Sequence, residues 1–197
     1  MIEDEILARF NSQFDRLLSV VAIANLRVTS EPADELFLDN QNVFIKSFLV
    51  SACSVLEAFI QELAFSYLQE VAEKVRRANI PYNAVAWMYR PDDKKYLKFE
   101  SFEIDKKAKD ISDIISPNYG KTLNAFRRVG VELDHAALGI FKDEVSSIVD
   151  KRNKIVHEND DASDLSFVDI TTTIHTFKAY AACLYKCVAE DRHRQLV

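Results

Sequence analysis

The stretch VFIKSFLVSACSVLEAFIQELAFSYLQEV, residues 43–71, decides the fold. Its apolar residues recur at steps of three and four, which is the spacing of one face of an α-helix. The main stripe comprises Phe44, Phe48, Ala52, Val55, Phe59, Leu63, Tyr67 and Val71, and it is widened by Leu49, Leu56, Ile60 and Leu68. We therefore predict a long helix over about residues 43–79, buried at the centre of a helical bundle.

Glu57 is out of place in this stretch, because it is the only charged residue between Lys46 and Glu62. A carboxylate in such apolar surroundings must be paired or must face a cleft. Two interpretations stay open. Glu57 is either an exposed edge position of the helix or an acidic partner that orients a functional side chain, for which Arg152 and His157 are the candidates.

Helical periodicity also marks much of the remaining chain. It covers about residues 3–29, 119–128, 133–156 and 166–190, and a short helix is expected within 104–115. Ser166 and Asp169 have the spacing of a capping pair at the start of the last helix. Only 3 glycines and 4 prolines occur in 197 residues, which favours long helices over many strands.

Residues 80–117 lack a clear period and mix aromatic with cationic side chains. Such a segment either packs its aromatic residues onto the bundle or binds single-stranded RNA by stacking and phosphate contact. The expected fold is an all-α bundle of about five to seven helices, with a long central helix and an irregular insertion around 80–117. A single domain over residues 1–197 is expected from the length.

The composition is that of a protein with a sizeable core, with 48% hydrophobic and 28% charged residues. A net charge of −6 argues against a protein that coats long duplexes, although it allows a local basic cleft. Cys53, Cys183 and Cys187 are too few and too scattered for a disulfide framework or a zinc site. Cys183 and Cys187 are expected to be small packed residues, and no cofactor is expected.

The N-terminal sequence is acidic, unlike a secretory or mitochondrial leader. The most apolar stretch, residues 48–65, is interrupted by Glu57, Gln61 and Glu62, which disfavours a membrane span. A cytoplasmic location is therefore expected.

The candidate functional motif is DKRNKIVHEND, residues 150–160. Arg152 carries a permanent cation with a planar fork of donors suited to phosphate. His157 can exchange a proton near neutral pH, and Asn153 follows the arginine directly. Together they can cut a phosphodiester that supplies its own 2′-hydroxyl nucleophile.

Five residues on a straight helix separate Arg152 and His157 by roughly 140° of rotation and about 7.5 Å of rise. They would converge if the helix ended near Val156 and His157 swung round. They would also converge if a second copy of the helix lay opposite in a symmetric dimer. The plainer interpretation is a helix end whose cations meet the helix dipole.

A bundle whose penultimate helix ends in Arg-Asn-Lys-Ile-Val-His, followed by a polar turn and one last helix, resembles the HEPN superfamily. The long helix with Ser-Val-Leu-Glu-Ala-Phe at residues 54–59 adds to this resemblance, which is nearest to ribonucleases of bacterial defence and toxin–antitoxin systems. Asn153 fits the polar position of that family, and Glu57 fits its acidic position. Asn159 stands where toxins modified by a nucleotidyltransferase carry a tyrosine.

The resemblance implies a metal-independent endoribonuclease with a composite site in a homodimer. It implies that His157 is a general acid or base, that Arg152 stabilises the scissile phosphate, and that Asn153 and Glu57 position these groups. The implied partners are an RNA substrate and an antitoxin or defence-system protein, with no membrane. The alternatives are a non-catalytic HEPN-like interaction or nucleotide-binding module, and a helical adaptor in which the motif is only surface.

Overall fold

A computed structural model of the protein describes residues 2–89 and 107–194, and the side chains of residues 5–89 and 107–191. The described residues form nine helices and no strand, and six of these helices have eight residues or more. The helices are α1 (Ile2–Thr29), α2 (Glu35–Asp39), α3 (Gln41–Ala78), α4 (Tyr82–Tyr89), α5 (Ala108–Ser112), α6 (Tyr119–Val129), α7 (His135–Gly139), α8 (Lys142–Glu158) and α9 (Phe167–Arg194). The predicted all-α bundle is confirmed.

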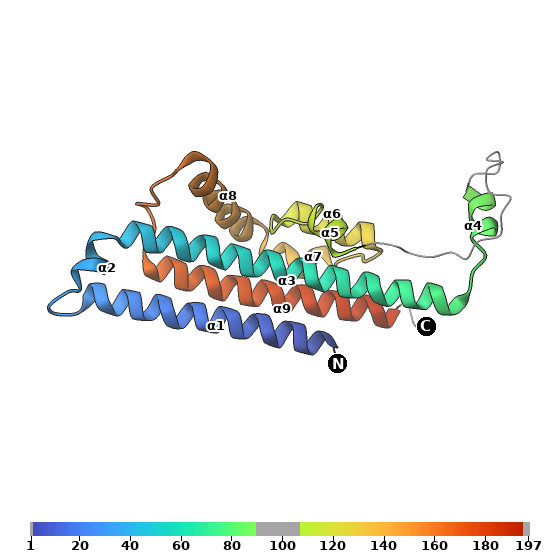
Figure 1. Cartoon of the computed structure of the whole chain (residues 1–197), viewed down its shortest axis with the longest axis horizontal. Coiled ribbons are helices and arrows are strands. Elements are labelled where there is room, and N and C mark those ends of the chain that lie inside the picture. Colours follow the sequence, from blue (N-terminus) through green and yellow to red (C-terminus); the bar gives the residue numbers. More distant parts are fainter. Residues whose placement is uncertain (1, 90–106, 195–197) are drawn as a thin grey trace.

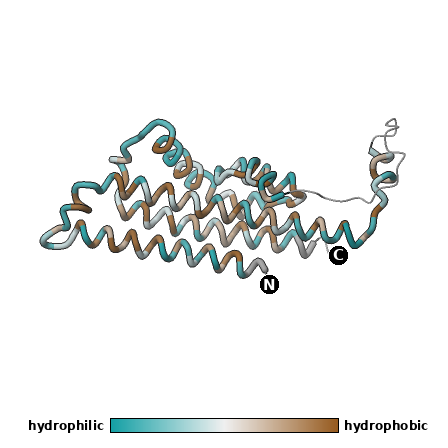
Figure 2. Tube along the Cα trace, in the orientation of Figure 1, coloured by the Kyte–Doolittle hydropathy of each residue, from teal (hydrophilic) through white to brown (hydrophobic). Residues whose placement is uncertain are grey.

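The three long helices α1, α3 and α9 run side by side and form the body of the molecule (Figure 1). Hydrophobic residues recur along each of them (Figure 2). One face of α3 is buried, as its periodicity predicts; its buried residues are Ile45, Phe48, Leu49, Ala52, Cys53, Leu56, Phe59, Ile60, Leu63, Ala64 and Tyr67. By length and composition, α3 is the one helix among the described residues that is apolar enough to cross a membrane.

The long helices contact one another through apolar side chains in the core and through ion pairs at the protein surface. The rings of Phe10 and Phe59 meet edge to face, with centroids 5.6 Å apart, which joins α1 to α3. Lys178 of α9 pairs with Asp15 of α1 at the surface. The core therefore comes from the apolar stripes, and the exposed ion pairs add little to its stability.

The short helices α5, α6, α7 and α8 lie together on one side of the three long helices (Figure 1). Of these, α5, α6 and α8 contact α3, and α7 contacts α9. The single helix expected over 133–156 is wrong, because Ile140 and Phe141 interrupt it and separate α7 from α8. Within the expected irregular insertion, residues 82–89 and 108–112 are helical, and residues 90–106 lie outside the described part of the chain.

The ends of α6 and the start of α9 follow local sequence rules. The Asn118 side chain accepts a hydrogen bond from the Lys121 backbone N–H at 3.2 Å and caps α6. Gly130 ends α6 in the left-handed conformation, with φ of 94°. At the start of α9, the Asp169 carboxylate accepts hydrogen bonds from the Ser166 hydroxyl at 2.6 Å and from its backbone N–H at 2.8 Å. The predicted capping pair is confirmed.

Candidate active site

Arg152 occupies a position on the inward face of α8 that would otherwise be apolar. Val145, Val149 and Ile155 on the same helix are buried, and Arg152 lies three residues from each of the last two. Its guanidinium Nη2 donates to Glu57 Oε2 on α3 at 3.1 Å. The two side chains are 19% and 31% exposed, so the pair is partly desolvated and reaches the surface.

This ion pair explains the charged residue in the apolar stretch of α3. A guanidinium packed among apolar residues needs a counter-charge, and Glu57 supplies it across the contact between α3 and α8. The structure therefore places Glu57 as the partner of Arg152. The pair fixes the direction of the arginine and leaves the remaining guanidinium donors for another acceptor.

Cys53 lies one helical turn before Glu57 and is completely buried. Burial raises the pKa of its thiol to about 12, and the nearby Arg152 guanidinium opposes this rise only in part. The thiol therefore stays protonated near neutral pH and packs as a small apolar group beneath the ion pair.

His157 lies in the last turn of α8 and is exposed. Among the residues that the structure describes, its imidazole has no hydrogen-bond or ion-pair partner. Asn153 precedes it by four residues, so the two side chains lie on adjacent turns of one helix face. Asn153 is half-buried.

His157 lies within the helix, so the first of the two possible ways for Arg152 and His157 to converge, a swing of His157 beyond the helix end, does not occur. α8 continues to Glu158, and Asn159 ends it in the left-handed conformation, with φ of 54°. The backbone N–H groups of Asn159 and Asp160 both donate to the Lys154 carbonyl, which closes the helix end. Arg152 and His157 therefore face different directions in a single chain.

Lys151 holds the turn that follows the motif, a role that the sequence patterns did not reveal. Its Nζ donates to Asp160 Oδ1 at 2.8 Å and to Asp164 Oδ1 at 2.5 Å. These carboxylates raise the pKa of Lys151, and the ammonium in turn holds the pKa of Asp160 below its ordinary value. Asp160 also accepts a hydrogen bond from the Ala162 N–H at 2.7 Å, so the turn is fixed from both sides.

Other side chains considered for function lie outside this site. His135 begins α7 and His175 lies on α9, and both are exposed. Cys183 is half-buried, and its thiol donates to the Ala137 carbonyl at 3.6 Å, while Cys187 is buried. No group of three or more His, Cys, Asp or Glu side chains suited to a metal ion is found among the described residues.

The sequence model of a family described as RiboL-PSP-HEPN matches residues 12–190. The chain belongs to this HEPN family. Comparison with curated proteins and with solved structures finds no match. The match begins within α1 and ends within α9, so it includes Arg152 and His157 on α8 and Glu57 on α3.

In this HEPN protein, Arg152 and His157 have the spacing Arg-x-x-x-x-His. They lie on α8, which contacts α3, α6 and α9. The arginine is set by an ion pair and the histidine is left to solvent. In the 80–117 segment, two of the aromatic residues, Trp87 and Tyr89, lie on α4 and are exposed. The aromatic residues at 96, 99 and 102 lie outside the described residues.

Proposed function

We propose that the protein is a metal-independent endoribonuclease whose active site is completed by a second copy of the chain. The observation that carries this proposal is the Arg152–Glu57 ion pair at 3.1 Å. It holds a guanidinium at the surface in a set direction, next to a helix end that presents a histidine. Membership of a HEPN family supports the same reading.

In this mechanism, Arg152 binds the scissile phosphate. One edge of the guanidinium is held by Glu57, and its free donors meet the non-bridging oxygens. Charge grows on these oxygens as the 2′-hydroxyl attacks phosphorus, and the fixed guanidinium stabilises that charge. The oxygen–phosphorus bond to the 5′-oxygen then breaks, which leaves a 2′,3′-cyclic phosphate.

His157 exchanges the protons that this reaction moves. As general base it takes the proton of the 2′-hydroxyl, or as general acid it gives one to the leaving 5′-oxygen. Asn153, on the same face of α8, orients the imidazole. DNA is spared, because it lacks the internal nucleophile.

Two chains are needed because one chain does not bring Arg152 and His157 together. The solvent side of α3, next to the edge that carries Glu57, offers a surface for the second copy. Ser47, Ser51, Ser54 and Ala58 form an exposed stripe of short side chains there. The three serine hydroxyls donate to backbone carbonyls four residues earlier, at 2.7 to 2.9 Å, so they add no unsatisfied donor. Short, satisfied side chains permit close approach of helices, and this supports a two-fold homodimer.

The proposed enzyme acts in the cytoplasm, as part of a toxin–antitoxin or antiviral defence system, with an antitoxin or defence protein as regulatory partner. Asn159 stands at the position of the modified tyrosine, so regulation by nucleotidyl transfer is not part of the proposal. The competing function is a non-catalytic HEPN module for partner or nucleotide binding, and the separation of Arg152 and His157 in one chain is the observation in its favour.

The deciding experiment measures cleavage of single-stranded RNA in the presence of a metal chelator. The purified parent protein is compared with His157→Ala and Arg152→Ala. We expect each substitution to lower the rate on the order of 10²-fold or more, because each removes a group that acts in the transition state. His175→Ala, which changes an exposed histidine on α9, serves as the matched control and should cut at the parent rate.

Mixing the two inactive proteins tests the composite site. If each half-site needs Arg152 from one chain and His157 from the other, a heterodimer of the two variants regains one intact half-site. Recovered cleavage on mixing supports the proposal. RNA cleavage that is equal in the parent and both variants would reject it.

A further inference from the structure

The exposed face of α6 is cationic in a protein of net charge −6. Lys121, Arg127 and Arg128 are exposed, and no residue of this helix is acidic. The opposite face is held in the bundle by buried residues, namely Tyr119, Thr122, Ala125, Phe126 and Val129. The cations are therefore fixed in place by a packed helix rather than by a loop.

None of these three cations has a carboxylate partner among the residues that the structure describes. The cations at the C-terminal end of α3 differ in this respect. On α3, Lys74 pairs with Glu70 at 2.8 Å, and Arg76 and Arg77 both pair with Glu73, at 2.6 and 2.9 Å. Three uncompensated positive charges on one short helix give a local positive potential.

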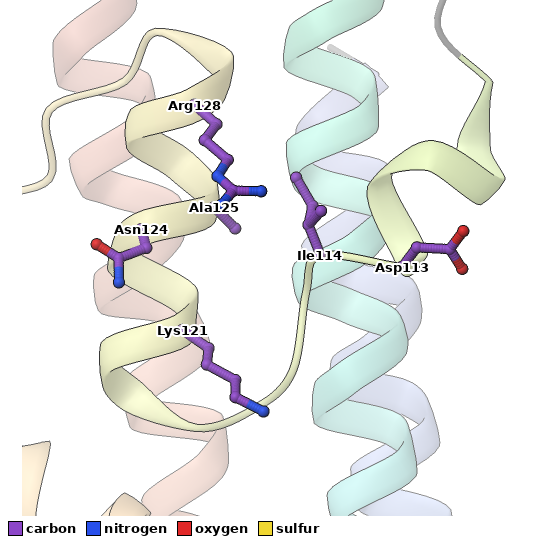
Figure 3. A pocket seen from close by; sticks show the side chains of 6 residues that line it. All are labelled: Asp113, Ile114, Lys121, Asn124, Ala125 and Arg128. Carbon is purple, nitrogen blue, oxygen red and sulfur yellow. The ribbon is translucent and has the colours of Figure 1, made fainter.

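Two of the α6 cations, Lys121 and Arg128, border a hollow between α5 and α6. Figure 3 shows Lys121 and Arg128 extending from α6 toward the segment that carries Ile114. Asp113 lines the opposite wall, but its carboxylate is directed away from α6 (Figure 3). The hollow thus offers the cationic side chains of Lys121 and Arg128 to an anionic group.

We infer that this hollow and the cationic face of α6 bind the phosphate backbone of single-stranded RNA, away from the bond that is cut. The ligand chemistry is a chain of phosphodiesters, since spaced single cations suit spaced single negative charges. α6 contacts α8 and lies on the same side of the bundle, so an RNA strand held at Arg152 can also reach α6. The inference rests on the proposed function for its choice of RNA.

The binding test uses a single-stranded oligouridylate with 2′-O-methyl groups and a fluorescent end label. This probe keeps the phosphates and lacks the free 2′-hydroxyl, so it reports binding without cleavage. Fluorescence anisotropy gives Kd over a range of salt concentrations for the parent and for a Lys121→Gln, Arg127→Gln, Arg128→Gln triple variant. We expect the triple variant to bind roughly tenfold more weakly or worse at low salt, and its slope of log Kd against log salt to fall by about 2.

A matched control removes the same residue types elsewhere. The Lys74→Gln, Arg76→Gln, Arg77→Gln variant loses one lysine and two arginines that are exposed and already paired with Glu70 and Glu73. It should bind as the parent does. The Asp113→Asn variant removes a negative charge from the wall of the hollow and should bind more tightly.

Three results would overturn the inference. The first is that the α6 triple variant binds with the parent Kd and salt slope. The second is that the α3 control loses as much affinity as the α6 variant. In the third, polyglutamate competes for the site as well as unlabelled oligouridylate does at equal charge, which would assign the surface to an acidic protein partner. Circular dichroism of both triple variants checks that each retains the helical fold.

Failure of this inference and failure of the nuclease proposal give different patterns. If the α6 variant loses probe binding while Arg152→Ala and His157→Ala leave RNA cleavage unchanged, the RNA surface stands and the proposed active site falls. If those two variants abolish cleavage while the α6 variant binds and cuts as the parent does, the active site stands and the α6 inference falls.

Discussion

The helices α8 and α6 lie on the same side of the bundle, and both contact α3, yet among the described residues the half-buried cations of α8 are paired and the exposed cations of α6 are not. On α8, Lys151 and Arg152 are each tied to carboxylates, at 2.5 to 3.1 Å. On α6, the exposed cations have no such partner within the described part of the chain. Figure 2 shows that hydrophilic residues on α8 alternate with shorter hydrophobic stretches.

The difference separates two tasks of positive charge. A paired cation has a fixed direction, which suits a group that must meet one phosphate in one geometry. An unpaired cation keeps its full attraction for a distant anion, which suits the capture of a long charged strand. The comparison predicts that α8 variants change geometry and stability, whereas α6 variants change the salt dependence of binding.

The largest effect is expected from breaking the ion pair of α8. Glu57→Leu leaves the Arg152 guanidinium among apolar residues without its counter-charge. We expect a loss of about 1–2 kcal/mol in the free energy of unfolding, between the values for buried and exposed pairs. RNA cleavage should fall on the order of 10²-fold, because the arginine is no longer held in position. Urea unfolding and a cleavage assay measure the two quantities.

The double variant Glu57→Leu, Arg152→Met is the control for this prediction. Removing both charges leaves no stranded ion, so its stability should return toward that of the parent while cleavage stays lost. A double variant that is less stable than Glu57→Leu alone would contradict the assigned pairing.

A smaller effect is expected from the start of α6. Asn118→Ala removes the side chain that caps the Lys121 N–H, and it should cost about 1 kcal/mol of stability. Asn124→Ala, an exposed asparagine on the same helix with no capping role, should leave the unfolding midpoint nearly unchanged. Equal losses in the two variants would show that the Asn118 cap does not position α6.

The smallest effect is local and concerns Lys151. Lys151→Met should leave global stability near the parent value, since the pair lies at the surface, but it should release the turn that follows α8. Hydrogen exchange at the Asn159 and Asp160 amides should become faster. Lys154→Met, which removes an exposed lysine without an ion pair, should not change this exchange.

The same pair gives a pH dependence of defined sign. The pKa of Asp160 is lowered, so its contribution to stability is present above the ordinary carboxyl value of 3.8 and is lost as the pH falls through the lowered value. The pKa of Lys151 is raised, so its contribution is present below 10.5 and is lost as the pH rises through the raised value. In Lys151→Met, an NMR titration should show the pKa of Asp160 moving back up toward 3.8.

Periodicity predicted the long helices well, because α1, α3 and α9 each bury a continuous stripe of apolar residues at helical spacing. It missed the interruption at Ile140 and Phe141, since neither residue is a helix breaker and the apolar spacing continues across it. Gly139, the last residue of α7, is the local signal for this break, because glycine favours helix ends over helix interiors.

Part of the site was also readable from the sequence. Glu57 stood out because a carboxylate inside an apolar stripe needs a partner, and the structure pairs it with Arg152. Lys151 did not stand out, because its partners Asp160 and Asp164 lie in a turn whose course depends on the left-handed residues Asn159 and Ala162. The catalytic roles of Arg152, His157, Asn153 and Glu57 stay predictions.

Cys53 gives the α3–α8 contact a built-in chemical reporter. Alkylating reagents attack the thiolate, and a completely buried thiol with a pKa near 12 offers almost none at neutral pH. Modification of Cys53 therefore requires the helices around it to open, and its rate of alkylation measures how often they do so. Opening of the contact beside Arg152 is thus measurable at a native cysteine, without introducing one by substitution.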